Sequence, residues 1–281
     1  MMDSPLVSTD WLAERLGEPG LVILDGSWHM PADDRDAKAE YAQGHIPGAV
    51  FFDIDEIADH ATDLPHMLPT PQSFATAARR LGVDPDSTVV VYDSVGVFSA
   101  PRVWWTFRVM GHERVFVLDG GLKRWVAEGL ALESSWREPA HGEFKAHFRA
   151  DLVANFDDVR RIVETGGPQL VDARSAARFR GDAPEPRPGL RAGHMPGAHN
   201  VPWSAVTASD GSVADPQGLR AAFEAGGVDL AGPIITTCGS GLTAALLALG
   251  LARLGREDVA VYDGSWSEWG AKSDAPAATG L

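Results

Sequence analysis

The sequence predicts an α/β protein of two domains, each built on a mainly parallel β-sheet flanked by helices. Short apolar runs alternate with stretches of helical periodicity, a pattern typical of parallel sheets covered on both faces. The second half of the chain repeats motifs of the first half at a nearly constant offset. The length of 281 residues also suits two domains of ordinary size.

The strands of the first half are predicted from apolar runs that are short and continuous, as buried parallel strands are. These runs span 21–25, 49–51, 89–92 and 115–118. Helices are predicted between them where a capping residue or proline precedes a helical period. Ser8 or Thr9 can cap a helix over 10–16, Thr70 with Pro71 can open one that ends near 81, and the longest spans 100–110.

The repeat predicts the domain organisation. Gly-His-Ile-Pro-Gly-Ala at 44–49 recurs as Gly-His-Met-Pro-Gly-Ala at 193–198, and Asp-Gly-Gly at 119–121 recurs as Asp-Gly-Ser at 263–265. The polar stretch between the halves has no clear period and suits a linker. We therefore predict a first domain over 1–138, a linker over 139–150 and a second domain over 151–281.

The one cysteine of the chain stands at the position where chemistry is expected. Cys238 follows the apolar run 233–237 and precedes a helical pattern over 245–254, which predicts a strand, a tight loop and a helix. Glycines in the loop allow successive N–H groups to point inward and bind an anion, and the helix dipole favours negative charge there. A lone cysteine is usually a small buried apolar residue. Its position here instead predicts a nucleophile that ionises readily.

Composition and charge exclude several functions. The net charge of −15 argues against a nucleic-acid partner, and a single cysteine excludes an intramolecular disulfide, a Cys-x-x-Cys pair and a cysteine-rich zinc site. No apolar run is long enough to span a membrane, and residues 1–5 carry no targeting signal. We expect a cytoplasmic protein.

The paired Gly-His-x-Pro-Gly-Ala motifs, the Asp-Gly-x segments and the cysteine loop resemble those of the tandem-domain rhodanese family, over essentially the whole chain. The loop at 238–244, Cys-Gly-Ser-Gly-Leu-Thr-Ala, is similar to the Cys-Gly-Ser-Gly-Val-Thr-Ala of 3-mercaptopyruvate sulfurtransferases. Thiosulfate sulfurtransferases typically carry an Arg-Lys pair after the cysteine. At the corresponding position of the first half stands Asp93, so the first domain is expected to be inactive.

Two other classes of cysteine enzyme fit the sequence less well. Phosphatases with a Cys-x5-Arg loop need an arginine six residues after the cysteine to clamp phosphate, and that position is Ala244. A Cys-His-Asn hydrolase is not excluded by residue types, although no other part of the chain has that pattern.

The resemblance also implies the substrate-binding residues. Two arginines of the family map onto Arg178 and Arg187, whose guanidinium groups suit the carboxylate and carbonyl of a keto acid. Arg180 and Arg191 lie nearby. In the family an acid and a histidine reach the loop serine from across the domain interface, which implies a triad of Asp55, His66 and Ser240, with Asp53 as a rival acid. The remaining loop residues expected to surround the substrate are Gly239, Gly241, Leu242 and Thr243.

The sequence therefore predicts a sulfurtransferase. Sulfur would pass from 3-mercaptopyruvate through a Cys238 persulfide to a thiol acceptor, such as thioredoxin or a small thiol, or to cyanide. The site is expected at the carboxyl ends of the second sheet's strands, between the domains. No metal or organic cofactor is expected. Two alternatives stay open: thiosulfate as the donor, and a persulfide carrier or scaffold with little turnover.

Overall fold

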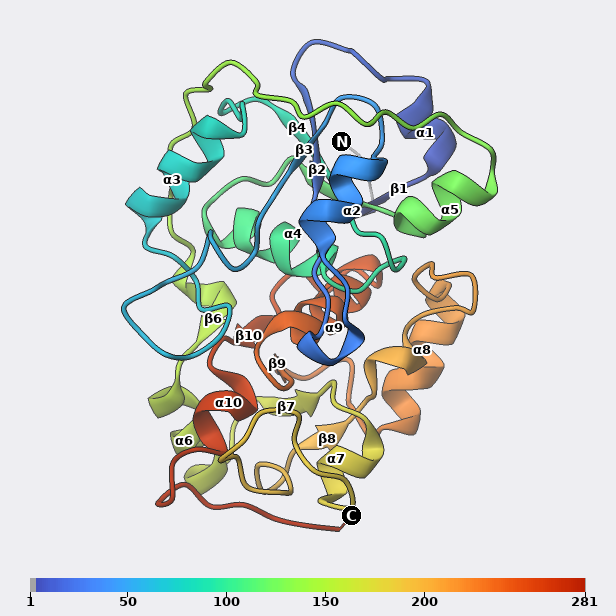
Figure 1. The fold of residues 1–281 in the computed structure, drawn as a ribbon. Coiled ribbons are helices and arrows are strands. Elements are labelled where there is room, and N and C mark those ends of the chain that lie inside the picture. Colours follow the sequence, from blue (N-terminus) through green and yellow to red (C-terminus); the bar gives the residue numbers. More distant parts are fainter. Residues whose placement is uncertain (1–3, 281) are drawn as a thin grey trace. The chain divides into compact units, whose positions relative to one another are not determined.

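The computed structural model describes residues 4–280. Residues 1–3, part of the stretch searched for a targeting signal, lie outside the described residues. The described chain forms two compact units (Figure 1). The first contains 4–59, 68–149 and 208–213, and the second contains 60–67, 150–207 and 214–280. Each unit thus includes a short segment from the other half of the chain, while the domain bounds expected from the sequence remain a prediction.

The first unit is built on a five-stranded parallel sheet of order β1-β5-β4-β2-β3, flanked by helices (Figure 1). Its elements are β1 (Leu6–Val7), α1 (Thr9–Ala13), β2 (Leu21–Asp25), the 3₁₀ turn η1 (Pro31–Asp33), α2 (Ala37–Gln43), β3 (Ala49–Phe51), α3 (Pro71–Arg80), β4 (Thr88–Tyr92), α4 (Ala100–Val109), β5 (Val115–Leu118) and α5 (Gly121–Ala127).

The second unit has a sheet of the corresponding order, β6-β10-β9-β7-β8, and all its strand pairs are parallel. Its elements are η2 (Ala150–Leu152), β6 (Val153–Ala154), α6 (Phe156–Thr165), β7 (Gln169–Asp172), α7 (Ala176–Arg180), β8 (His199–Asn200), η3 (Trp203–Ala205), α8 (Pro216–Ala225), β9 (Ile234–Thr237), α9 (Leu242–Arg253), β10 (Ala260–Tyr262) and α10 (Ser265–Trp269). The predicted fold class is confirmed.

Start signals in the sequence located the three helices predicted in the first unit, α1, α3 and α4. Thr70 caps α3 by accepting a hydrogen bond from the Ser73 N–H at 3.2 Å, and Pro71 is the first helical residue, as predicted. The prediction for the helix after the cysteine loop was wrong at its start. Helix α9 begins at Leu242 rather than at 245, because Gly241 adopts a φ of 77° that turns the chain directly into the helix.

The segment predicted as a linker lies along the first unit up to Arg149. The backbone N–H of Phe144 donates to the carbonyl of Val83 at 3.1 Å, and that of His147 donates to Met110 at 2.8 Å. The Phe144 ring is buried among other aromatic rings, with edge contacts to Phe74 and Phe107. A polar sequence without period can therefore still be held in one place by backbone hydrogen bonds and a single apolar anchor.

The histidines of the two Gly-His motifs are structural. His45 stacks on Tyr41, with ring centroids 4.0 Å apart, and its Nδ1 lies 2.7 Å from the Tyr41 carbonyl. His194 repeats the arrangement on Phe179, at 3.8 Å between centroids and 2.8 Å to the carbonyl. Each imidazole fixes the end of the helix before the turn.

Tryptophans near the chain's repeated Asp-Gly motifs lie in the cores. Trp125 is buried in the first unit, and Trp266 and Trp269 are buried in the second. Within residues 4–280, no helix combines the length and the apolar character needed to cross a membrane.

The loop of the first unit that corresponds to the cysteine loop is filled by its own side chain. Asp93 follows β4 and is fully buried. One carboxylate oxygen accepts hydrogen bonds from the N–H groups of Val95 and Gly96 at 3.0 and 3.1 Å. The other accepts three, at 2.7 to 2.9 Å, from the next N–H groups of the loop and the start of α4: Phe98, Ser99 and Ala100. The Asp93 carboxylate is therefore the anion that this loop binds.

This arrangement predicts that Asp93→Asn destabilises the protein. An amide keeps one acceptor oxygen but turns an NH₂ group toward backbone donors, and hydrogen bonds to charged groups contribute about 1.5–3 kcal/mol each. We expect urea denaturation to show a loss of at least about 2 kcal/mol in the free energy of unfolding. Asp86→Asn makes the same chemical change at an exposed position of this unit and should have little effect. Equal stability of both variants would contradict the assignment.

Candidate functional site

The second unit presents Cys238 at the carboxyl end of β9, the middle strand of its sheet. Ligands of open α/β sheets bind at this end of the strands. The cysteine is only 2% exposed, and Ser240 is also buried. Helix α9 begins directly after the loop and is buried along most of its length, so the partial positive charge of its N-terminus acts in surroundings that screen it weakly.

The backbone of the cysteine loop is fixed by the start of α10. The Cys238 N–H donates to the Ser265 hydroxyl oxygen at 3.2 Å, and that hydroxyl donates to the Tyr262 carbonyl at 2.8 Å. The Trp266 N–H donates to the Cys238 carbonyl at 3.0 Å. Ser265 has a φ of 49°, an unusual value for a residue other than glycine, which the surrounding contacts maintain.

A second serine of α10 holds the next residue of the loop. Both the N–H and the hydroxyl of Ser267 donate to the Gly239 carbonyl, at 2.8 and 2.7 Å. With their carbonyls directed toward α10, Cys238 and Gly239 are held in one conformation. A fixed loop backbone gives the thiol and the following N–H groups defined directions before any substrate arrives.

Arg178 lies directly against this loop. A Cβ placed on Gly239 would lie 3.0 Å from Nη2 of Arg178, so the guanidinium group occupies the space beside the glycine. Arg178 comes from α7, and its side chain is 23% exposed. The guanidinium group of Arg178 is also fixed by Glu185, which accepts hydrogen bonds from its Nη2 and Nε at 2.5 and 3.2 Å.

Glu185 belongs to a buried network of four charges. Its carboxylate, 2% exposed, also accepts from Nη1 of Arg174 at 2.8 Å, and Arg174 is paired with Asp172 at 2.7 Å. Burial alone would lower the pKa of Arg174, but the two carboxylates outweigh burial and raise that pKa above its ordinary value. The network of Asp172, Arg174, Arg178 and Glu185 carries no net charge. It therefore positions Arg178 as a directed donor and adds no general positive field.

Arg187 and His66 lie together. Nη2 of Arg187 is 3.4 Å from Nε2 of His66, a contact in which the arginine donates and the imidazole nitrogen accepts. His66 is buried and belongs to the 60–67 segment of the second unit, although it comes from the first half of the chain. Its φ of 61° is strained for a histidine. The structure thus brings two predicted site residues into contact within one unit.

Asp55, the predicted acid of the triad, lies in the first unit. Its Oδ2 accepts a hydrogen bond from the Trp28 indole N–H at 2.9 Å. The rival acid, Asp53, accepts hydrogen bonds from the N–H groups of Asp55 and Glu56 at 3.2 and 3.1 Å. Such bonds to the following backbone are typical of an aspartate that stabilises a turn. The triad of Asp55, His66 and Ser240 stays a prediction.

Sequence reasoning missed the residues that support this site. Glu185 lies between Arg178 and Arg187 in the sequence, and an acid placed between basic residues could have indicated an ion-pair network. Ser265 lies in the repeated Asp-Gly-Ser motif, yet its bond to the cysteine N–H depends on contact between β9 and α10, which no local pattern reveals. Among the described residues, no group of three or more His, Cys, Asp or Glu side chains could hold a metal ion.

Comparison with known proteins gives one consistent result. The family model described as "Rhodanese-like domain" matches residues 8–128 and 155–272. The chain is 48% identical to 3-mercaptopyruvate sulfurtransferase of Escherichia coli K12, over 96% of each protein. It is 45% identical to the human 3-mercaptopyruvate sulfurtransferase, over 94% of this chain and 91% of that protein. It is also 46% identical to the mitochondrial thiosulfate/3-mercaptopyruvate sulfurtransferase 1 of Arabidopsis thaliana, over 97% and 77%.

A solved structure agrees with these relatives. The crystal structure of SseA from Escherichia coli, which its title places among the 3-mercaptopyruvate sulfotransferases with a rhodanese fold, superposes with a TM-score of 0.86. The two chains are 45% identical, and the match covers 94% of this chain and 99% of that one.

The two serines of α10 give a matched test of the loop. Ser265→Ala leaves the buried Cys238 N–H without its acceptor, whereas in Ser267→Ala the Gly239 carbonyl keeps the Ser267 N–H. An unsatisfied buried group costs about 1–3 kcal/mol. In urea denaturation we expect Ser265→Ala to lose about 1–2 kcal/mol more than Ser267→Ala. An equal loss in the two variants would show that the Ser265 bond does not fix the loop.

Proposed function

Because the chain belongs to the rhodanese-like family, and is a sulfurtransferase, we propose that it takes sulfur from 3-mercaptopyruvate and carries it as a persulfide on Cys238. The observation that supports this most directly is the loop itself. A cysteine stands at the end of the middle strand, an oriented guanidinium group lies beside it, and a glycine and a serine follow.

The donor follows from the groups around the thiol. Thiosulfate is a compact dianion whose leaving group, sulfite, needs fixed positive charge next to the cysteine. Here Gly239 and Ser240 occupy the two positions after the cysteine, and the charge of Arg178 is balanced by Glu185. Directed donors without net charge suit a planar keto acid better than a dianion. The names of the relatives support the same donor, and those of Arabidopsis thaliana keep thiosulfate as an alternative.

In the first step, the Cys238 thiolate attacks the sulfur of 3-mercaptopyruvate. A new S–S bond forms, the C–S bond of the substrate breaks, and its electron pair stays on the departing carbon as the enolate of pyruvate. We assign the substrate carboxylate and keto oxygen to Arg178 and Arg187. The enolate then takes up a proton, for which Ser240 is the nearest hydroxyl in the loop sequence. Asp55 and His66 are proposed to supply and orient that proton through Ser240.

In the second step, an acceptor thiolate attacks the outer sulfur of the persulfide and regenerates the Cys238 thiolate. Until then, the persulfide anion is stabilised by N–H groups of the loop, among them those of Gly239, Gly241, Leu242 and Thr243. Thioredoxin, a low-molecular-weight thiol, or cyanide in an assay can serve as the acceptor. The reaction proceeds by two displacements on one cysteine and uses no metal or organic cofactor.

We also propose that the protein works in a reducing compartment, the cytoplasm, because the single cysteine has to stay reduced between turnovers. We also infer that the two halves are an internal repeat. Shared strand order and matching loops support that inference. A slow carrier of persulfide remains the alternative to an enzyme with rapid turnover.

The persulfide assignment predicts a mass change confined to one residue. Incubation with 3-mercaptopyruvate without an acceptor should add one sulfur, about 32 Da, to Cys238, and cyanide should remove it. Cys238→Ser should fold normally and take up no sulfur, because a hydroxyl is a far weaker nucleophile than a thiolate. Intact-protein mass spectrometry measures the sulfur bound to each protein, and steady-state assays in parallel measure turnover. Stoichiometric loading without turnover would favour the carrier, and activity in the folded variant would exclude Cys238 as the nucleophile.

The donor assignment predicts a preference in kcat/KM for 3-mercaptopyruvate over thiosulfate of about a hundredfold or more, equivalent to about 3 kcal/mol. Both donors should be assayed on one preparation with cyanide as acceptor. Arg187→Ala should lower kcat/KM for 3-mercaptopyruvate at least about tenfold, because a carboxylate loses its paired guanidinium. The matched control is Arg180→Ala, which removes a half-buried arginine of α7 paired with Asp182. Better use of thiosulfate would overturn the donor while leaving sulfur transfer intact.

A further inference from the structure

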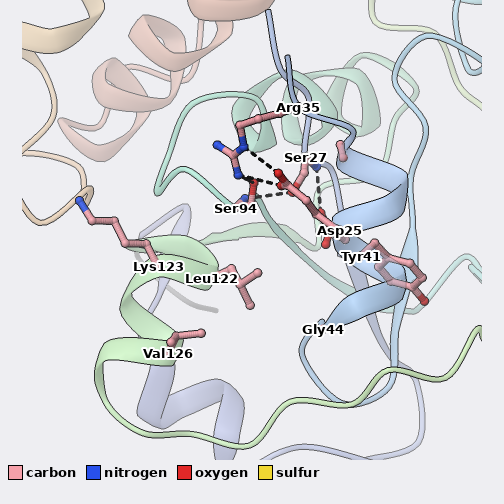
Figure 2. Close-up of a pocket in the computed structure, with 11 residues that line it drawn as sticks. Asp25, Ser27, Arg35, Tyr41, Gly44, Ser94, Leu122, Lys123 and Val126 are labelled. Carbon is pink, nitrogen blue, oxygen red and sulfur yellow. Dashed lines mark hydrogen bonds and ion pairs between the residues drawn. The ribbon is translucent and has the colours of Figure 1, made fainter. Parts of the chain in front are cut away.

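The first unit contains a pocket of about 340 Å³ beside the carboxyl end of β2 (Figure 2). Asp25, the last residue of β2, lies at its inner side and is 2% exposed. Ser27, Glu40, Gly44 and Leu122 also line it. The sulfur chemistry proposed above uses none of these residues.

The second unit shows what the same position can hold. Asp25 is paired in the sheet with Tyr92, the residue before Asp93, and Asp172 is paired with Thr237, the residue before Cys238. The two aspartates therefore correspond. The Ser27 N–H donates to Asp25 at 2.9 Å, and the Arg174 N–H donates to Asp172 at 2.8 Å. Ser27 thus stands where the second unit has Arg174.

In the second unit, the Arg174 guanidinium has three contacts that correspond to the pocket wall. It donates to the Asp172 carboxylate at 2.7 Å and to the Gly193 carbonyl at 2.9 Å, and it lies 4.4 Å from the centroid of the Trp266 ring. Together with the Glu185 carboxylate, which accepts from Nη1 of Arg174 at 2.8 Å, these contacts surround the planar cation with two acids, a carbonyl acceptor and an apolar face.

The counterparts of the glycine and the tryptophan line the pocket of the first unit. Gly44 and Gly193 begin the two Gly-His motifs. Leu122 corresponds to Trp266, because its N–H donates to the Asp93 carbonyl at 2.9 Å just as that of Trp266 donates to the Cys238 carbonyl. The pocket therefore keeps the acid, the carbonyl and an apolar wall, while serine replaces the arginine that fills this space in the second unit.

The carboxyl group of Asp25 has only neutral donors around it. Ser27 donates through both its N–H and its hydroxyl, and the Tyr92 hydroxyl interacts with the same group. Burial raises the pKa of Asp25 to about 6, and these hydrogen bonds offset only part of the effect. A buried carboxylate in such surroundings is costly to ionise, and a bound cation would remove that cost.

The two cations of the pocket wall are bonded to groups other than Asp25, although Arg35 stays within the wall, because its partners Glu40 and Ser94 also line the pocket. Arg35 donates through Nε and Nη2 to both oxygens of Glu40, each at 2.7 Å. It is 42% exposed at the mouth of the pocket. Lys123 donates to the Ser209 carbonyl at 3.4 Å, and Figure 2 shows its side chain extending away from Asp25.

We propose that this pocket binds the guanidinium group of a ligand, either a small molecule or an arginine side chain of another protein, in the position that Arg174 takes in the second unit. The ligand would donate to the Asp25 carboxylate and the Gly44 carbonyl and pack its apolar stem against Leu122. This site is independent of the proposed sulfur donor.

Isothermal titration calorimetry at pH 8 tests the proposal, with methylguanidinium chloride as the probe at concentrations too low to denature. We expect methylguanidinium to bind at least about tenfold more tightly than ethylammonium, which carries the same charge without a planar fork. Asp25→Asn should weaken binding at least about tenfold. Asp86→Asn, the same change on an exposed carboxylate of this unit, should leave it unchanged. Equal affinity for the two cations, or full binding by Asp25→Asn, would overturn the proposal.

Two further arms identify the source of the ligand and repeat the test independently. Free arginine and a blocked Gly-Arg-Gly peptide are titrated in parallel, and tighter binding of the peptide indicates a protein partner. Ser27→Arg should place a guanidinium group in the pocket from within the chain. We expect this variant to bind no methylguanidinium and to melt at a higher temperature at pH 8 than the unsubstituted protein. Undiminished binding by a folded Ser27→Arg protein would contradict the proposal.

Discussion

The arrangement of the candidate site depends on one buried carboxylate shared by two arginines. Glu185 holds Arg174, which is fixed to the end of β7 through Asp172, and it holds Arg178, which lies against the cysteine loop. Removing one member of a buried ion network leaves an uncompensated charge, so each of the four groups depends on the other three to stay buried and charged. The direction of Arg178 is therefore tied to the sheet through a chain of paired charges.

The two units use the same framework but place different groups in the loop after the middle strand. In the second, this loop begins with Cys238, and the Arg178 guanidinium group lies beside the next residue, Gly239. In the first unit, the Asp93 carboxylate accepts hydrogen bonds from N–H groups of the corresponding loop. Glu40 lies on α2, the helix that follows Ser27. Both sheets require an aspartate at the end of the strand, yet only the second unit supplies the cation that balances it.

The sequence predicted what depends on local order along the chain. The strands, the position of Cys238 before a helix and the Thr70 cap follow from neighbouring residues, and the structure confirms them. Contacts between distant segments could not be predicted in this way. The bond from Ser265 to the cysteine N–H needs α10 to return to β9, and the contact of Arg187 with His66 joins residues from opposite halves. Helix α9 begins three residues before the predicted start at 245, because the positive φ of Gly241 turns the chain into the helix. The sequence around Gly241 does not reveal this backbone conformation.

The space beside Gly239 bears on how donor preference can change during evolution. Its missing side chain leaves room for the Arg178 guanidinium, which lies 3.0 Å from where a Cβ would be. A larger residue there, such as the arginine that follows the cysteine in thiosulfate enzymes, meets the end of the Arg178 side chain, so this guanidinium group has to shift. The two positions are therefore coupled, because a side chain at position 239 and the Arg178 guanidinium group compete for the same space. The effect of a substitution in the loop then depends on which residue α7 presents to it.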